Sequence, residues 1–144
     1  MEVIRTARVP AVTIEPTATV HDAVTLMAAK QVGAVVVVNS QKQVIGIFTE
    51  RDNLLRVSVR RRDLERTRIC EVMTSPVETI PPETNVQTAL ERMIRRHFRH
   101  LPIVDIDNHP IGIVSIRYLL MRRMSEQRHS MDILAAYVEA GGPG

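Results

Sequence analysis

Two polar residues three positions apart, Thr49 and Asp52, follow a short apolar run that contains Gly46. A threonine in this place starts a helix, and the free N–H groups of a helix start favour anions, so a phosphate could bind there beside the Thr49 hydroxyl. The Asp52 carboxylate suits the paired hydroxyls of a sugar, because it accepts hydrogen bonds from both. This spacing therefore predicts a ribose next to a phosphate.

The same residues also have a purely structural interpretation. Thr49-Glu50-Arg51-Asp52 is a capping box, in which a threonine and an acid satisfy free backbone N–H groups and bind nothing else. Taken alone, the tetrapeptide favours this structural interpretation.

A second copy of the motif favours the ligand-binding interpretation over the purely structural one. Residues from Pro10 to Leu54 align without a gap with residues 66 positions later, and 13 of the 45 aligned pairs are identical. A unit of about 60 residues is marginal by itself, so we expect the two copies to fold as a pair and to place function in the groove between them.

The elements around the first motif follow from local patterns. Residues 1–9 form a lead-in arm, and residues 12–14 predict a short strand. Thr19 and Asp22 form a capping box for an amphipathic helix, which we expect Gly33 to end. Residues 34–38 and 44–48 read as a strand hairpin, and Thr49 begins a helix that carries Leu54 and Leu55.

The second copy repeats this order. Its predicted strands include Val77 with Ile80, residues 101–104 and residues 111–114. Asn85 is expected to cap a helix that turns five apolar residues inward, namely Val86, Ala89, Leu90, Met93 and Ile94.

Two further segments lie outside the repeat. In the linker, Ile69, Val72 and Met73 predict a short helix against the core, and Cys70 is expected to be half-buried. After residue 124, Met131, Leu134, Ala135 and Val138 predict a last helix, which stops at Gly141–Gly144. We interpret it as a cover for the module, with a dimer contact as the alternative. The predicted domains are 1–57, 58–74 (linker), 75–124 and 125–144.

Composition excludes several classes of protein. A hydrophobic content of 44% excludes a disordered chain, and no apolar run approaches the about 20 residues that span a bilayer. The N-terminus does not resemble a signal peptide and Cys70 is the single cysteine, so we expect a cytoplasmic protein. The net charge of +3 comes mostly from arginine, which suits phosphate or carboxylate partners.

The full set of features resembles the cystathionine β-synthase (CBS) domain. It consists of Gly33 before an apolar strand, Gly46 in the hairpin, Thr49 and Asp52, all within a tandem repeat. Two further stretches support the resemblance, namely 70–74 before the second copy and 99–105 at its middle strand. Two such repeats are similar to a Bateman module over residues 10–124.

The resemblance implies an α/β fold of two βαββα repeats, related by a pseudo-two-fold axis, with clefts for adenine nucleotides. It carries over to the following contact residues: Thr49, Asp52, Gly33, Ala34 and Val35 from the first copy; Ser115, Arg99, His100 and Leu101 from the second; and Thr13, Ile14, Thr79 and Ile80 on the base side.

The second copy departs from the pattern at Tyr118, which stands where the ribose-binding acid belongs. A phenol cannot accept from two hydroxyls as a carboxylate does. We therefore expect unequal clefts, with the nucleotide on the Thr49/Asp52 side and weak, altered or no binding on the Ser115/Tyr118 side.

The sequence thus predicts a non-catalytic regulatory module, acting as a homodimer or through an effector protein. The ligand could be AMP, ADP, ATP (with Mg²⁺), NAD or S-adenosylmethionine. No metal site is expected, because His97, His100 and His109 lack a nearby carboxylate or thiol cluster. Two alternatives stay open: nucleic-acid binding through residues 60–68 and 95–99, and a structural dimer with vestigial clefts.

Overall fold

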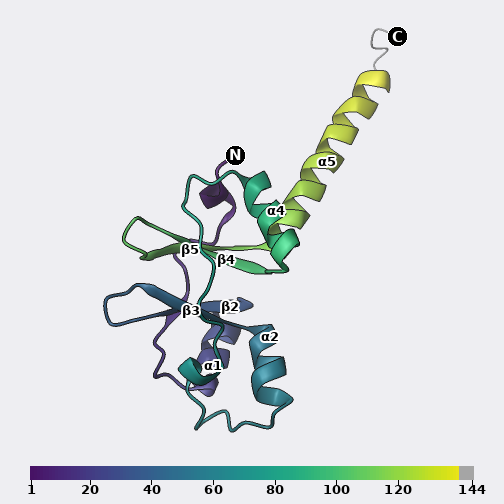
Figure 1. The fold of residues 1–144 in the computed structure, drawn as a ribbon. Helices are drawn as coiled ribbons and strands as arrows, with labels where there is room; N and C mark the ends of the chain where they lie inside the picture. The colour runs from purple at the N-terminus through teal and green to yellow at the C-terminus, as the bar shows by residue number, and fades with distance from the viewer. Residues whose placement is uncertain (140–144) are drawn as a thin grey trace.

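The computed structural model describes residues 1–139 and contains two small sheets (Figure 1). The first sheet has the order β1-β2-β3, with β1 parallel and β3 antiparallel to β2, and the second is the antiparallel pair β4-β5. The strands are β1 (Thr13–Ile14), β2 (Ala34–Val38), β3 (Val44–Thr49), β4 (His100–Val104) and β5 (Pro110–Ser115).

Helices cover the outer faces of the sheets. In Figure 1, α1 and α2 lie beyond the first sheet and α4 lies beyond the second. The helical elements are η1 (Val3–Thr6), α1 (Val20–Lys30), α2 (Glu50–Asp52), η2 (Asn53–Ser58), α3 (Ile69–Val72), α4 (Val86–Arg96) and α5 (Ile116–Glu139). The predicted α/β architecture with two repeats is confirmed.

The β2 strand is buried on both of its faces, which explains its unbroken apolar sequence. Val35 and Val37 pack under α1, whereas Val36 and Val38 belong to a cluster that also contains Ile113 of the second repeat. The repeats are therefore joined by a shared apolar layer, as expected for two halves that cannot bury enough surface alone.

The segment before each repeat packs on the other repeat. Val3 of the lead-in arm lies in the core of the second repeat, and Arg8 pairs with Ile113 of β5. Conversely, Ile69 of the linker lies in the core of the first repeat, and Thr74 pairs with Ile47 of β3. This exchange of lead-in segments ties the halves together.

Several local predictions are confirmed. The Thr19/Asp22 capping box forms, with the Thr19 side chain accepting from the Asp22 N–H at 3.1 Å. Asn85 caps α4, and α3 forms with its two apolar residues buried.

Other local predictions are wrong. The α1 helix ends at Lys30, and Gln31 rather than Gly33 takes the left-handed cap conformation, with φ of 55°. Ile94 faces outward on α4, with 55% of its surface exposed. Ile80 forms an isolated bridge to Ile103 rather than a strand with Val77, and Cys70 is exposed.

The predicted terminal helix is not a separate element. It continues from Ile116 as the single 24-residue helix α5, which projects away from both sheets (Figure 1). Met131 and Val138 are exposed, so the described part of this helix does not cover the module, and that prediction is wrong. Gly141–Gly144 lie outside the described residues.

The exchanged linker gives a stability prediction. Replacing Ile69, which is fully buried, by alanine should lower the free energy of unfolding by about 2–5 kcal/mol, because it leaves a cavity in the first repeat. Replacing Ile106, which is 99% exposed, by alanine is the control and should change it by less than about 0.5 kcal/mol. Urea unfolding measures both, and equal effects would contradict the packing role of the linker.

Candidate functional site

A pocket of about 990 Å³ opens where the two repeats meet. Three pairs of equivalent positions, 66 residues apart, line it together, so it lies on the pseudo-two-fold axis. These pairs are Gly33 with Arg99, Ala34 with His100, and Glu50 with Ile116.

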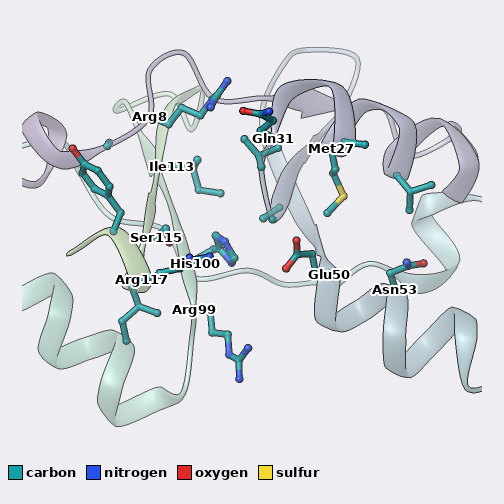
Figure 2. Close-up of a pocket in the computed structure, with 18 of the residues that line it drawn as sticks. Arg8, Met27, Gln31, Glu50, Asn53, Arg99, His100, Ile113, Ser115 and Arg117 are labelled. Atoms are coloured by element: carbon teal, nitrogen blue, oxygen red, sulfur yellow. The ribbon is translucent and has the colours of Figure 1, made fainter. Parts of the chain in front are cut away.

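Backbone hydrogen bonds hold the two sides of the pocket in equivalent ways. The N–H of Glu50 donates to the carbonyl of Gly33 at 3.0 Å, and the N–H of Ile116 donates to the carbonyl of Arg99 at 2.9 Å. Each bond fixes the first residue of a helix beside the start of a strand. As a result, Glu50 and His100 point toward one another across the pocket (Figure 2).

Gly33 leaves this approach open. A Cβ at position 33 would lie 3.4 Å from Nε2 of His100 and 3.4 Å from the carboxyl carbon of Glu50. A side chain here would therefore fill the space between the two facing groups.

Two buried polar atoms on the pocket wall have no hydrogen-bond partner in the described residues. They are Nδ1 of His100 and Oδ1 of Asn53. Buried polar groups are nearly always paired, so such an orphan needs an explanation, and a bound molecule supplies one. Burial, reinforced by the positive charge of Arg99, lowers the pKa of His100 below its usual 6.5, and Glu50 opposes this shift. The imidazole is therefore neutral at pH 7.

Three arginines from separate segments surround the same space. Arg8 comes from the lead-in arm, Arg99 precedes β4, and Arg117 lies in the first turn of α5. Within residues 1–139, none of the three forms a salt bridge with a carboxylate. Glu50 is the one carboxylate among the described lining residues, so the pocket offers net positive charge to an anion.

The second-copy motif contributes directly to the pocket wall. Ser115 pairs with His100 across the β4-β5 ladder, and both line the pocket. Tyr118, half of whose surface is exposed, lies on the same wall. Its ring is available to stack on a planar group.

The first-copy motif is used differently. Oδ2 of Asp52 accepts from the N–H and the hydroxyl of Thr49, at 3.0 and 3.1 Å. Oδ1 accepts from the hydroxyl of Thr74 at 3.0 Å and lies 3.6 Å from Nε of Arg56. Asp52 is 7% exposed, so its acceptors are occupied by the protein itself.

The linker packs over the Thr49/Asp52 side of the axis. Arg56 also donates to the carbonyl of Met73 at 2.8 Å. The Met73 sulfur occupies the space over Gly46, since a Cβ there would meet it at 2.7 Å. We call the contacts among Asp52, Thr74, Arg56 and Met73 the linker latch.

The pocket brings together five of the predicted contact residues, namely Gly33, Ala34, Arg99, His100 and Ser115. The structure does not place the other eight on it: Thr49, Asp52, Val35, Thr13, Ile14, Thr79, Ile80 and Leu101. Val35, Ile80 and Leu101 are fully buried in apolar clusters. Ligand binding by any of these residues stays a prediction.

Sequence reasoning missed Arg8, Arg117, Glu50 and Asn53. Glu50 and Asn53 flank the Thr49/Asp52 motif and could have been found from their position on its helix. Arg8 could have been found by extending the repeat alignment, because its equivalent 66 residues later is Thr74, the last residue of the stretch 70–74 that supports the resemblance.

The expectation that no carboxylates lie near His109 is wrong. Asp105, Asp107 and His109 place ligand atoms within 4.8 Å of one another in the β4-β5 turn. Asp105 accepts from the N–H groups of Asp107 and His109, both at 2.9 Å. These bonds account for the cluster as a turn structure.

A family model for the CBS domain matches residues 2–52 and 69–125. The chain belongs to the CBS-domain family. The matched ranges are the two repeats with their exchanged lead-in segments, which agrees with the packing described above.

Similar proteins are themselves CBS-domain proteins. The mitochondrial CBS domain-containing protein CBSX3 of Arabidopsis thaliana is 37% identical over 127 residues, 85% of this chain and 61% of that protein. The chain thus spans less than two thirds of that relative.

Solved structures show the same architecture. A CBS-domain protein from Burkholderia ambifaria MC40-6, whose name refers to signal transduction, has a TM-score of 0.80 and 31% identity, over 88% of this chain and 96% of that one. A hexameric CBS-CP12 protein from bloom-forming cyanobacteria has a TM-score of 0.78 and 25% identity, over 99% of this chain and 88% of that one. Within residues 1–139, no helix is both long and apolar enough to cross a membrane.

The buried imidazole gives a pH prediction. Because the pKa of His100 is lowered in the folded chain, protonation favours the unfolded chain. The stability contributed by neutral His100 is present above pH 6.5 and should be lost as pH falls below it. Urea unfolding at pH 7.5, 6.5 and 5.5 measures this loss.

The matched variants are His100→Gln and His129→Gln, since His129 is an exposed histidine on α5. His100→Gln should flatten the dependence over this range, whereas His129→Gln should keep it. An unchanged slope in His100→Gln would contradict the assignment to His100.

Proposed function

We propose that the chain is a non-catalytic regulatory module that binds an adenine nucleotide in the pocket between its CBS repeats. The observation that carries the proposal is that, within residues 1–139, three arginines without a salt bridge and two buried polar atoms without a hydrogen-bond partner line one open space. The arginines suit phosphates, and the orphaned atoms suit the polar edges of a base or sugar. The choice of adenine rests on the family resemblance.

The geometry favours ligand binding on the Ser115/Tyr118 side of the axis, whereas the sequence suggested the Thr49/Asp52 side. The Thr49/Asp52 side is filled by the linker latch, whereas Ser115 and Tyr118 border open space. The proposal therefore keeps two unequal clefts but exchanges their roles. The nucleotide binds on the Ser115/Tyr118 side, where Tyr118 stacks on the base.

A thermal-shift panel tests the class of ligand. AMP, ADP, ATP with Mg²⁺, NAD and S-adenosylmethionine are compared with adenosine and inorganic triphosphate. A ligand at about a hundredfold over its dissociation constant adds about 2.7 kcal/mol, so a rise of several degrees is expected. No shift with any nucleotide would overturn the proposal and favour a vestigial cleft.

Calorimetric titration of variants tests the site. Arg99→Ala should weaken binding about tenfold or more, because it removes a charge-assisted hydrogen bond. Arg60→Ala, an exposed linker arginine, is the control and should bind normally. Tyr118→Ala should weaken binding and Asp52→Asn should not. The reverse pattern would show that the ligand binds on the Asp52 side.

Nucleic-acid binding remains a second candidate because residues 60–62 are exposed. The other basic stretch is divided, since Arg96 pairs with Glu78 and Arg99 lines the pocket. Aromatic residues make up 3% of the chain, which leaves little to stack on bases. A gel shift that weakens with salt would support this candidate.

We also propose that the module associates with itself through one face. Leu54 and Leu55 of η2 are exposed, and so is Leu120 of α5, the repeat equivalent of Leu54. Equivalent apolar positions on both sides of the axis are suited to an isologous contact. The hexameric state of the similar CBS-CP12 protein is consistent with self-association. A cytoplasmic location and an effector protein stay predictions.

The variant Leu55→Glu should reduce self-association at this face, because it puts a charge into the buried contact. Glu65→Gln, in the exposed linker, is the control. Sedimentation over a range of concentrations measures the change, and an unaltered mass distribution in Leu55→Glu would contradict the assigned face.

A further inference from the structure

The outer part of α5 stands apart from the rest of the chain. The helix packs against α4 and β5 near its start, and residues 125–139 then project away from the sheets (Figure 1). These 15 residues extend about 22 Å. A helix of this length is marginal in water without tertiary contacts, so a covering partner would stabilise it.

The exposed face of α5 has a regular apolar pattern. Met121, Met124, Met131 and Val138 are 56%, 63%, 72% and 68% exposed. Together with Arg128 and Ala135, they follow alternating steps of three and four residues. A mean step of 3.5 residues is the heptad pattern of a left-handed coiled coil, in which these residues take the a and d positions.

We propose that α5 pairs antiparallel with α5 of a second copy of this chain, as a coiled coil centred between positions 129 and 130. In an antiparallel pair each a position faces a d position of the other helix. The layers are then Met121 opposite Val138, Met124 opposite Ala135, and Arg128 opposite Met131 of the second copy.

The charged residues select this orientation. A parallel pair would place Arg128 against Arg128, and like charges in contact are destabilising. In the antiparallel pair, Arg128 lies beside Asp132 of the second copy, which occupies the adjacent e position. Both residues are exposed in the single chain, so the second copy can reach them.

A second copy fits this face because the pattern of side chains on α5 is self-complementary. Met121 and Met124 face Val138 and Ala135 of the second copy. Arg128, the one cation on the stripe, packs over Met131 and reaches an anion from the same short segment. The proposal is independent of nucleotide binding and of the contact proposed at Leu55.

Disulfide trapping tests the register directly. In a Cys70→Ser background, which removes the exposed native thiol, chains carrying Arg128→Cys are mixed with chains carrying Met131→Cys. The mixture should form a mixed disulfide at least about tenfold faster than either variant alone, because only unlike positions face each other. Equal trapping within each single variant would show a parallel pair and overturn the proposal.

Association strength provides the second test, in the Leu55→Glu background so that only the α5 contact is measured. Met124→Glu, which faces Ala135 of the second copy, should raise the dissociation constant by at least about a hundredfold, since two methionines per pair lose their burial. His129→Glu, on the outer side of the same helix, is the matched control. No self-association in the background chain, or equal effects of the two variants, would overturn the proposal.

A charge exchange tests the ion pair. Asp132→Arg should weaken association, and adding Arg128→Glu to it should restore most of the loss, because the two charges then attract again. Failure of the double variant to recover would exclude the proposed register.

Discussion

The apolar layer between the two repeats is the contact on which the rest of the molecule depends. The β2 strand contributes to it from one face while its other face packs under α1, so this strand has no face exposed to solvent. Burial of this kind supplies most of the free energy that holds a small domain together. Because each lead-in segment also packs on the opposite repeat, separating the halves would expose both cores.

The same pseudo-two-fold packing generates the pocket. It brings the starts of β2 and β4 to the axis, where positions that were once equivalent become neighbours. Divergence at these positions then has direct chemical effects: the pair Gly33 and Arg99 leaves room on one side and adds charge on the other, and Glu50 faces a histidine. A symmetric backbone thus carries an asymmetric site.

The linker latch shows how one motif can serve two purposes. Thr49 and Asp52 cap a helix, and they also anchor the segment that enters the second repeat, through Thr74 and Arg56. In the second copy, Tyr118 cannot make the corresponding bonds, and that side is open. The aspartate is therefore needed where the chain crosses between repeats, which gives it a structural role independent of any ligand.

Local patterns along the chain were enough to predict most of the elements and the duplication. Capping boxes, the valine run of β2 and the gapless repeat depend on neighbours along the chain, so they can be recognised without a structure. Features that depend on distant residues were not predicted: Ile94 faces outward, Gln31 ends α1, and α5 continues past the module. The site belongs to this second group. A carboxylate that caps a helix and one that binds a ribose have the same sequence, and only the tertiary placement of Thr74 and Arg56 decided how the acceptors of Asp52 are used.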